Sequence, residues 1–74
     1  MPTFRVYASY HEKSLKVLLT TLKKAAKALK GISDVHTRKD ESGTYIVYTS
    51  SFKTASKLDM ALNFAGFNVY SKEI

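Results

Sequence analysis

Residues 44–49 read Thr-Tyr-Ile-Val-Tyr-Thr and form the stretch with the highest β-propensity in the chain. A cluster of turn-forming residues, Asp-Glu-Ser-Gly, lies directly before it at positions 40–43. Residues 35–39, Val-His-Thr-Arg-Lys, form a more polar extended stretch on the other side of that turn. Two extended stretches joined in this way predict a β-hairpin.

A strand and a helix are predicted before the hairpin. Residues 3–9 alternate between apolar and polar side chains, with the apolar ones at the even positions, so they predict a half-buried strand. Residues 11–30 repeat leucine and alanine at helical spacing, and Gly31 follows as a stop signal. Ser9 and Glu12 have the spacing of a capping box at the start of this helix.

A second helix and a last strand are predicted after the hairpin. Residues 52–65 place alanine and leucine on one helical face, with Ser50 or Ser51 as the cap and Gly66 as the stop. Residues 67–71 predict the last strand. With right-handed crossovers, the order β-α-β-β-α-β gives an α+β, ferredoxin-like fold. We expect an antiparallel sheet of four strands in the order 4-1-3-2, with both helices on one face, in a single domain that spans residues 1–74.

Basic residues outnumber acidic ones in this chain. Its 12 Lys and Arg residues and six Asp and Glu residues give a net charge of +6 and an isoelectric point near 9.7. This balance favours a polyanionic or acidic partner. The absence of cysteine excludes disulfides and favours a reducing, cytoplasmic compartment. The sequence has no signal-peptide pattern and no apolar run of membrane-spanning length, so we expect no membrane association.

No grouping of residues indicates catalysis. His11 and His36 are far apart in the predicted fold and lack the spacing of a metal site. The carboxylates fall in turns, on a helix face and near the end of the sequence, without an apolar pocket that would raise a pKa. We therefore expect a non-enzymatic protein with no catalytic residue, no metal and no cofactor.

The face of the predicted sheet that points away from the helices has an unusual composition. A solvated face is normally rich in Thr, Lys, Glu and Ser, whereas this one combines tyrosine rings with cations and is expected to carry no carboxylate. Rings offer stacking surfaces for bases, and cations hold phosphates. The residues expected on this open face are Arg5, Tyr7, His36, Arg38, Tyr45, Val47, Thr49, Asn68, Tyr70 and Lys72.

At these residues the chain resembles an RNA-recognition motif. Residues 6–10, Val-Tyr-Ala-Ser-Tyr, match the strand-1 motif of that family, and residues 44–48 match the second half of its strand-3 motif. Glu-Ser-Gly at 41–43 stands where the family has basic-Gly-aromatic. The resemblance implies binding of single-stranded RNA, with Tyr7 and Tyr45 stacking bases as one platform on the two central strands. The alternative is that these tyrosines are ordinary strand residues.

Lysines dominate the exposed arc of the first predicted helix. At about 100° per residue, six lysines share an arc of roughly 120°, and Glu12 is the only acid in or near the helix. Such an arc is either a solubility device or a track for phosphates, with Lys16, Lys23 and Lys27 as the representative contacts. The six are Lys13, Lys16, Lys23, Lys24, Lys27 and Lys30.

The second predicted helix carries Met60 and Phe64 opposite its core face, beside Lys53 and Lys57. This spacing indicates a small protein-contact patch or a dimer seam, unless one of the two tucks under a loop. Two functions therefore remain open for a monomer or weak homodimer. One is binding of single-stranded nucleic acid, with RNA favoured. The other is a protein-interaction module, of the kind found among phage and plasmid accessory or inhibitor proteins, that binds an acidic partner through the lysines or the patch.

Overall fold

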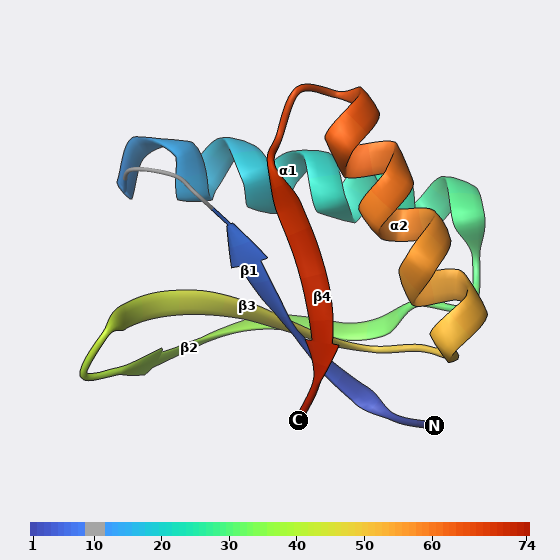
Figure 1. The fold of residues 1–74 in the computed structure, drawn as a ribbon, viewed down its shortest axis with the longest axis horizontal. Coiled ribbons are helices and arrows are strands. Elements are labelled where there is room, and N and C mark those ends of the chain that lie inside the picture. The colour runs from blue at the N-terminus through green and yellow to red at the C-terminus, as the bar shows by residue number, and fades with distance from the viewer. Residues whose placement is uncertain (9–11) are drawn as a thin grey trace.

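The computed structural model describes residues 1–8 and 12–74, and of residues 12–14 only the backbone. The four strands form one antiparallel sheet in the order β2-β3-β1-β4, which is the predicted order read from the opposite edge. The ferredoxin-like α+β fold is therefore confirmed (Figure 1). In chain order the elements are β1 (Thr3–Ala8), α1 (Glu12–Leu29), β2 (Ser33–Asp40), β3 (Gly43–Thr49), α2 (Phe52–Phe64) and β4 (Val69–Glu73).

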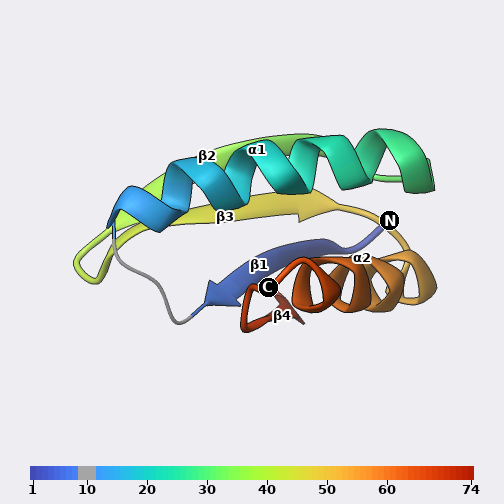
Figure 2. The same cartoon turned by 90° about the horizontal axis from the view of Figure 1, so that it is seen from above.

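Both helices lie on one side of the sheet, as Figure 1 shows. Seen from above, α1 follows the β2–β3 hairpin while α2 lies along β1 and β4 (Figure 2). The sheet is strongly twisted, so that the hairpin runs across the direction of β1 and β4. One face of the sheet is thus covered by helices and the other stays open.

The last strand begins at Val69, two residues later than predicted. The cause lies at the end of α2, where Gly66 has a positive φ of 101°. Its N–H donates to Asn63 O at 3.0 Å, and the N–H of Phe67 donates to Leu62 O at 3.0 Å. These two bonds form a Schellman motif, which keeps Phe67 in the helix terminus rather than in the sheet.

The second strand is longer than predicted at both ends. It begins at Ser33, where a bulge interrupts the register before His36 and Asp34 has a positive φ of 54°. It also continues to Asp40, which pairs with Gly43 across the hairpin turn. This added length at residue 40 places a carboxylate on the strand rather than in the turn.

The helix boundaries agree with the predictions to within about one residue. Ser51, one of the two predicted caps, caps α2 and accepts a hydrogen bond from Thr54 N at 3.2 Å. The predicted capping box of Ser9 and Glu12, like His11 and the side chain of Lys13, lies outside the described residues.

The core forms between the covered face of the sheet and the apolar stripes of both helices. The even positions of β1 and β3 point into it, as predicted. Phe4 stacks on Tyr48 with ring centroids 5.5 Å apart. The buried cluster comprises Phe4, Val6, Leu18, Leu22, Ile46, Tyr48, Ala55, Leu58, Leu62 and Val69.

Tyr48 is fully buried and still has a hydrogen-bond partner. Its hydroxyl donates to Ser71 Oγ on β4, and Ser71 Oγ donates to Asp59 Oδ1 on α2 at 2.6 Å. The backbone N–H of Ser71 donates to Asp59 Oδ2 at 2.9 Å. Burial raises the pKa of Tyr48 to about 12. This network joins β3, β4 and α2 through a neutral phenol and one carboxylate.

We predict that Asp59→Ala lowers the free energy of unfolding by about 2–3 kcal/mol, because a hydrogen bond to a charged group contributes about 1.5–3 kcal/mol. Urea unfolding followed by far-UV circular dichroism measures this loss. Glu41→Ala, in the exposed turn between β2 and β3, is the control and changes stability by less than about 0.5 kcal/mol. A similarly small effect of Asp59→Ala would contradict the role of the network.

Candidate nucleic-acid interface

The register of the strands brings the predicted residues of the open face into two rows. In one row, Val47 on β3 pairs with both His36 on β2 and Arg5 on β1, and Arg5 pairs in turn with Lys72 on β4. In the neighbouring row, Arg38 pairs with Tyr45, and Tyr7 with Tyr70. Residues from all four strands therefore share this face.

The aromatic side chains of this face form a continuous stack with Arg5. The guanidinium carbon of Arg5 lies 3.8 Å from the ring centroid of Tyr45 and 4.8 Å from that of Tyr7. On the far side, Tyr7 stacks on Tyr70, with centroids 5.2 Å apart and ring planes 12° apart. We call the series Tyr45, Arg5, Tyr7, Tyr70 the ring stack. Cation–π attraction and ring stacking hold its members together.

The ring stack differs from the platform predicted for Tyr7 and Tyr45. Both tyrosines lie on the central strands, as expected, but the guanidinium of Arg5 lies close to both rings and over that of Tyr45. Tyr70 on the edge strand β4 is the most accessible member, with 57% of its surface exposed. Among the described residues, Tyr7 is the only aromatic side chain that stacks on it.

Arg5 is held by the β2–β3 hairpin. Its Nη1 lies 3.3 Å from Asp40 Oδ2, and its Nη2 donates to Ser42 Oγ at 3.4 Å. The expectation of an open face without carboxylates is therefore wrong: β2 extends to residue 40, which brings Asp40 into phase with His36 and Arg38. Asp40 compensates the charge of Arg5, whose guanidinium lies against the rings of Tyr45 and Tyr7.

Asp40 also accepts two hydrogen bonds within the turn. Ser42 donates to Asp40 Oδ1 from its hydroxyl at 2.6 Å and from its backbone N–H at 2.8 Å. These bonds, together with the nearby charge of Arg5, hold the pKa of Asp40 below its usual value of 3.8. Asp40, which pairs with Arg5, is thus itself held in place by Ser42 of the turn.

The β2 edge of the open face carries a short chain of polar contacts. His36 Nδ1 lies 2.8 Å from Asp34 O and 3.5 Å from Asp34 Oδ1. Arg38 Nε donates to His36 Nε2 at 3.2 Å. Asp34 and Arg38 thus each contact one of the two ring nitrogens of His36. A second carboxylate therefore stands beside this face.

Val47 is fully buried although it belongs to the open face. Its register partners Arg5 and His36 flank it on the two neighbouring strands. The long side chains on either side cover the small apolar one, which gives the open face a buried apolar base of its own.

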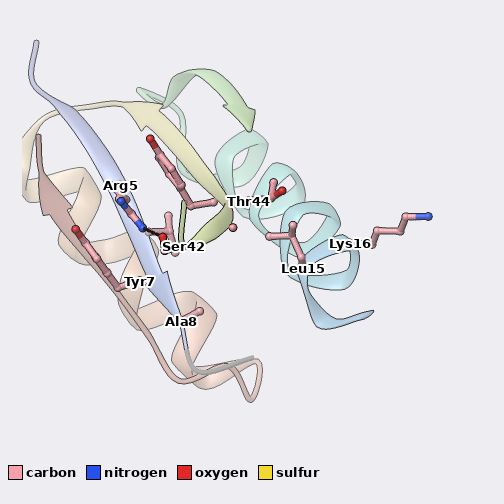
Figure 3. Close-up of a pocket in the computed structure, with 10 residues that line it drawn as sticks. Arg5, Tyr7, Ala8, Leu15, Lys16, Ser42 and Thr44 are labelled. Atoms are coloured by element: carbon pink, nitrogen blue, oxygen red, sulfur yellow. Dashed lines mark hydrogen bonds between the residues drawn. The ribbon is translucent and has the colours of Figure 1, made fainter. Parts of the chain in front are cut away.

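A cleft of about 480 Å³ opens where β1 and β3 separate (Figure 3). The pairing of the two strands ends at Val6 and Ile46, and beyond this point the twist of the sheet drives them apart. The volume lies in the range of about 300–1,000 Å³ that is typical of small-molecule sites. Sequence patterns do not reveal such a cleft, because strand alternation is unchanged where two strands diverge. It is lined by Arg5, Val6, Tyr7, Ala8, Leu15, Lys16, Ser42, Gly43, Thr44 and Tyr45.

The lysines of α1 lie on the other side of the molecule. Those whose side chains are described are all exposed, and none of them forms an ion pair with another described residue. Helix α1 covers the opposite face of the sheet (Figure 1). Its exposed residues Lys23 and Lys27 are therefore separated from the ring stack by the thickness of the domain. Lys16 is the exception, since it borders the cleft and extends outward from it (Figure 3). The fold therefore divides the predicted nucleic-acid residues between two surfaces.

Within the part of the chain that the structure describes, no three metal-ligating side chains come together and no helix is long and apolar enough to cross a membrane. No protein-family model, curated protein or solved structure matches this chain. The resemblance to an RNA-recognition motif therefore depends on the quoted motif residues and on the shared topology. The absence of catalysis and the kind of partner stay predictions from the sequence.

We predict that Ser42→Ala raises the pKa of Asp40 toward 3.8, because the hydroxyl of Ser42 is the largest contributor to its lowered value. A pH titration of the Asp40 carboxyl carbon by NMR measures the shift. Since the pKa of the folded protein is the lower one, this contribution to stability is present above pH 3.8 and is lost as the pH falls through the folded value. Lys39→Ala, on the adjacent residue, is the control and leaves the pKa low. An unchanged pKa in Ser42→Ala would refute the assignment.

Proposed function

We propose that the protein binds single-stranded nucleic acid, with RNA favoured, through the open face of its sheet. The observation that carries this proposal is the ring stack, which ends in an exposed tyrosine at the sheet edge. Stacking of a base on an aromatic ring contributes about 1–3 kcal/mol and needs no particular base. RNA is favoured over DNA by the resemblance to the RNA-recognition motif.

Tyr70 is the primary stacking residue in this proposal. Its ring is backed on one side by Tyr7, so it is already oriented before a base arrives. Pre-oriented rings lose little conformational entropy on binding. Tyr7 and Tyr45 then act mainly as the support of Tyr70 and Arg5, which modifies the direct stacking role that the sequence suggests for them.

The phosphates are assigned to cations near the ring stack. Lys72 is exposed and lies two residues from Tyr70 on the same strand face, and it has no ion-pair partner among the described residues. Arg38 is exposed on β2 beside Tyr45. The two cations stand on opposite edge strands, so a single strand that crosses the sheet passes both of them and the ring stack between them.

The cleft provides a second contact for the same strand. It borders Tyr7 and Tyr45 of the ring stack, and Lys16 stands at its rim. A base that leaves the sheet surface can enter the cleft while Lys16 meets its phosphate. The lysines farther along α1, Lys23 and Lys27, then contact phosphates beyond the nucleotides that lie on the sheet, without regard to base sequence.

We predict that Tyr70→Ala weakens binding of a fluorescein-labelled single-stranded RNA by about ten- to a hundredfold, measured by fluorescence anisotropy. Tyr70→Phe keeps the ring and retains affinity. The matched control is Phe64→Ala, another exposed aromatic residue on the opposite side of the molecule, which leaves the affinity unchanged.

Tyr48→Ala is the control for the strand phase, because loss of this buried ring destabilises the fold by about 3–5 kcal/mol. Equal RNA affinity of the parent and Tyr70→Ala, or no measurable binding by the parent, would overturn the proposed function.

We further predict that Lys23→Gln combined with Lys27→Gln reduces affinity alike for all RNA sequences. The slope of log K against log salt falls by roughly 0.7 for each lost phosphate contact on a single strand. The double change Lys53→Gln with Lys57→Gln removes the same charge at the same spacing from α2 and serves as the matched control. Equal slopes for the two double variants would assign the α1 lysines to solubility.

A further inference from the structure

One stripe along the solvent side of α2 combines cations with exposed apolar side chains. Lys53, Lys57, Met60 and Phe64 follow one another at spacings of four, three and four residues, which places them on one helical face. All four are exposed, Met60 by 70% and Phe64 by 97%. We call these four residues the α2 stripe.

Phe64 exposes more of its surface than any other large apolar side chain among the described residues. Phe52, also on α2, is partly exposed but packs edge-on against Phe4 with ring centroids 5.3 Å apart. Phe64 has no such ring contact within the described part of the chain. The alternative given by the sequence, that one of Met60 and Phe64 tucks under a loop, is not found, because both side chains are exposed. Both side chains offer apolar surface that a partner can remove from water.

The charge of the α2 stripe is entirely positive. The only acidic residue of α2 is Asp59, and its carboxylate is occupied by the backbone N–H and the hydroxyl of Ser71. Two copies of the chain that met through this stripe would bring together two lysines from each copy without a carboxylate between them. Charge complementarity therefore favours an acidic partner over a second copy.

We propose that the α2 stripe is a docking surface for an acidic segment of a partner protein. Carboxylates of that segment meet Lys53 and Lys57, and its apolar side chains cover Met60 and Phe64. The lysine pair and the apolar pair are centred seven residues apart, which corresponds to about two helical turns or roughly 10 Å. An amphipathic helix with two acids and two apolar residues at the same separation matches this arrangement when its acids lie against the lysine pair.

The α2 stripe is separate from the surface of the proposed function. Helix α2 lies on the helical side of the sheet (Figures 1 and 2). The ring stack is formed by strand residues that alternate with the core positions, so it lies on the open side. A partner on α2 therefore leaves Tyr70 and Lys72 accessible. Failure of RNA binding would not affect this second proposal, since the two depend on different residues.

The test uses NMR titration of the ¹⁵N-labelled full chain with a synthetic helical peptide. The peptide carries a Glu pair and a Leu pair centred seven residues apart, and a second peptide has Lys in place of Glu. The acidic peptide is expected to shift the amide signals of residues 53–64, and the Lys peptide to shift none. Phe64→Ser weakens binding of the acidic peptide by roughly tenfold or more. Val17→Ser is the matched control: Val17 is 57% exposed beside the lysines of α1, and its change leaves the affinity unaltered.

Several results would overturn the proposal. One is the absence of binding by the acidic peptide, and another is an affinity that Phe64→Ser does not change. Shifts confined to the α1 lysines would mark the interaction as general charge attraction. Analytical ultracentrifugation supplies a further outcome, because a dimer that Phe64→Ser abolishes would assign the α2 stripe to a second copy of the chain. Shifts of residues 53–64 on titration with RNA would assign it to nucleic acid.

Discussion

Tyr48 sets the orientation of the central strand, and the rest of the structure depends on that orientation. Its ring is fully buried against Phe4, and its hydroxyl reaches Ser71 and, through it, Asp59. A shift of β3 by one residue would exchange its two faces. The phenol of Tyr48 would then lie in solvent, and Tyr45 would enter the core without this network. The burial of one polar side chain, satisfied by a network from α2 and β4, therefore determines which side chains of β3 face outward.

Arg5 has the corresponding role on the open face. A guanidinium between two tyrosines is stabilised by both rings, but its charge also needs compensation where water is partly excluded. Asp40 and Ser42 supply this compensation from the hairpin turn. The result is a surface that is formed before any ligand binds, because Tyr70 stacks on Tyr7 and Arg5 is paired with Asp40. In the proposed function, a nucleic acid on this face meets rings that are held in place, and its phosphates contact Lys72 and Arg38.

The distribution of charge gives the molecule two distinct sides. The helical side carries the lysines of α1 and the α2 stripe, with little acidic compensation among the described residues. The open side carries the ring stack, where Asp40 is placed against Arg5 and Asp34 beside His36. Most of the net charge of +6 therefore lies on the helical side of the molecule. The two proposed partners, a nucleic acid and an acidic protein segment, are therefore assigned to different sides of the molecule.

Local pattern was sufficient to predict the elements, their order and the side to which most residues point. Alternation in residues 3–9 and 44–49 predicted Phe4, Val6 and Tyr48 as core residues, because a side-chain period of two leaves only two faces. The sheet order followed from the handedness of the crossovers.

Tertiary structure alone decided how the site is assembled. Asp40 and Arg5 are 35 residues apart in sequence, so their contact depends on the length of β2 and on the register of three strands. The burial of Val47 depends on long side chains from two neighbouring strands, and the cleft depends on the twist that separates β1 from β3. Each of these features arises from packing between segments distant in sequence, which a local periodicity does not encode.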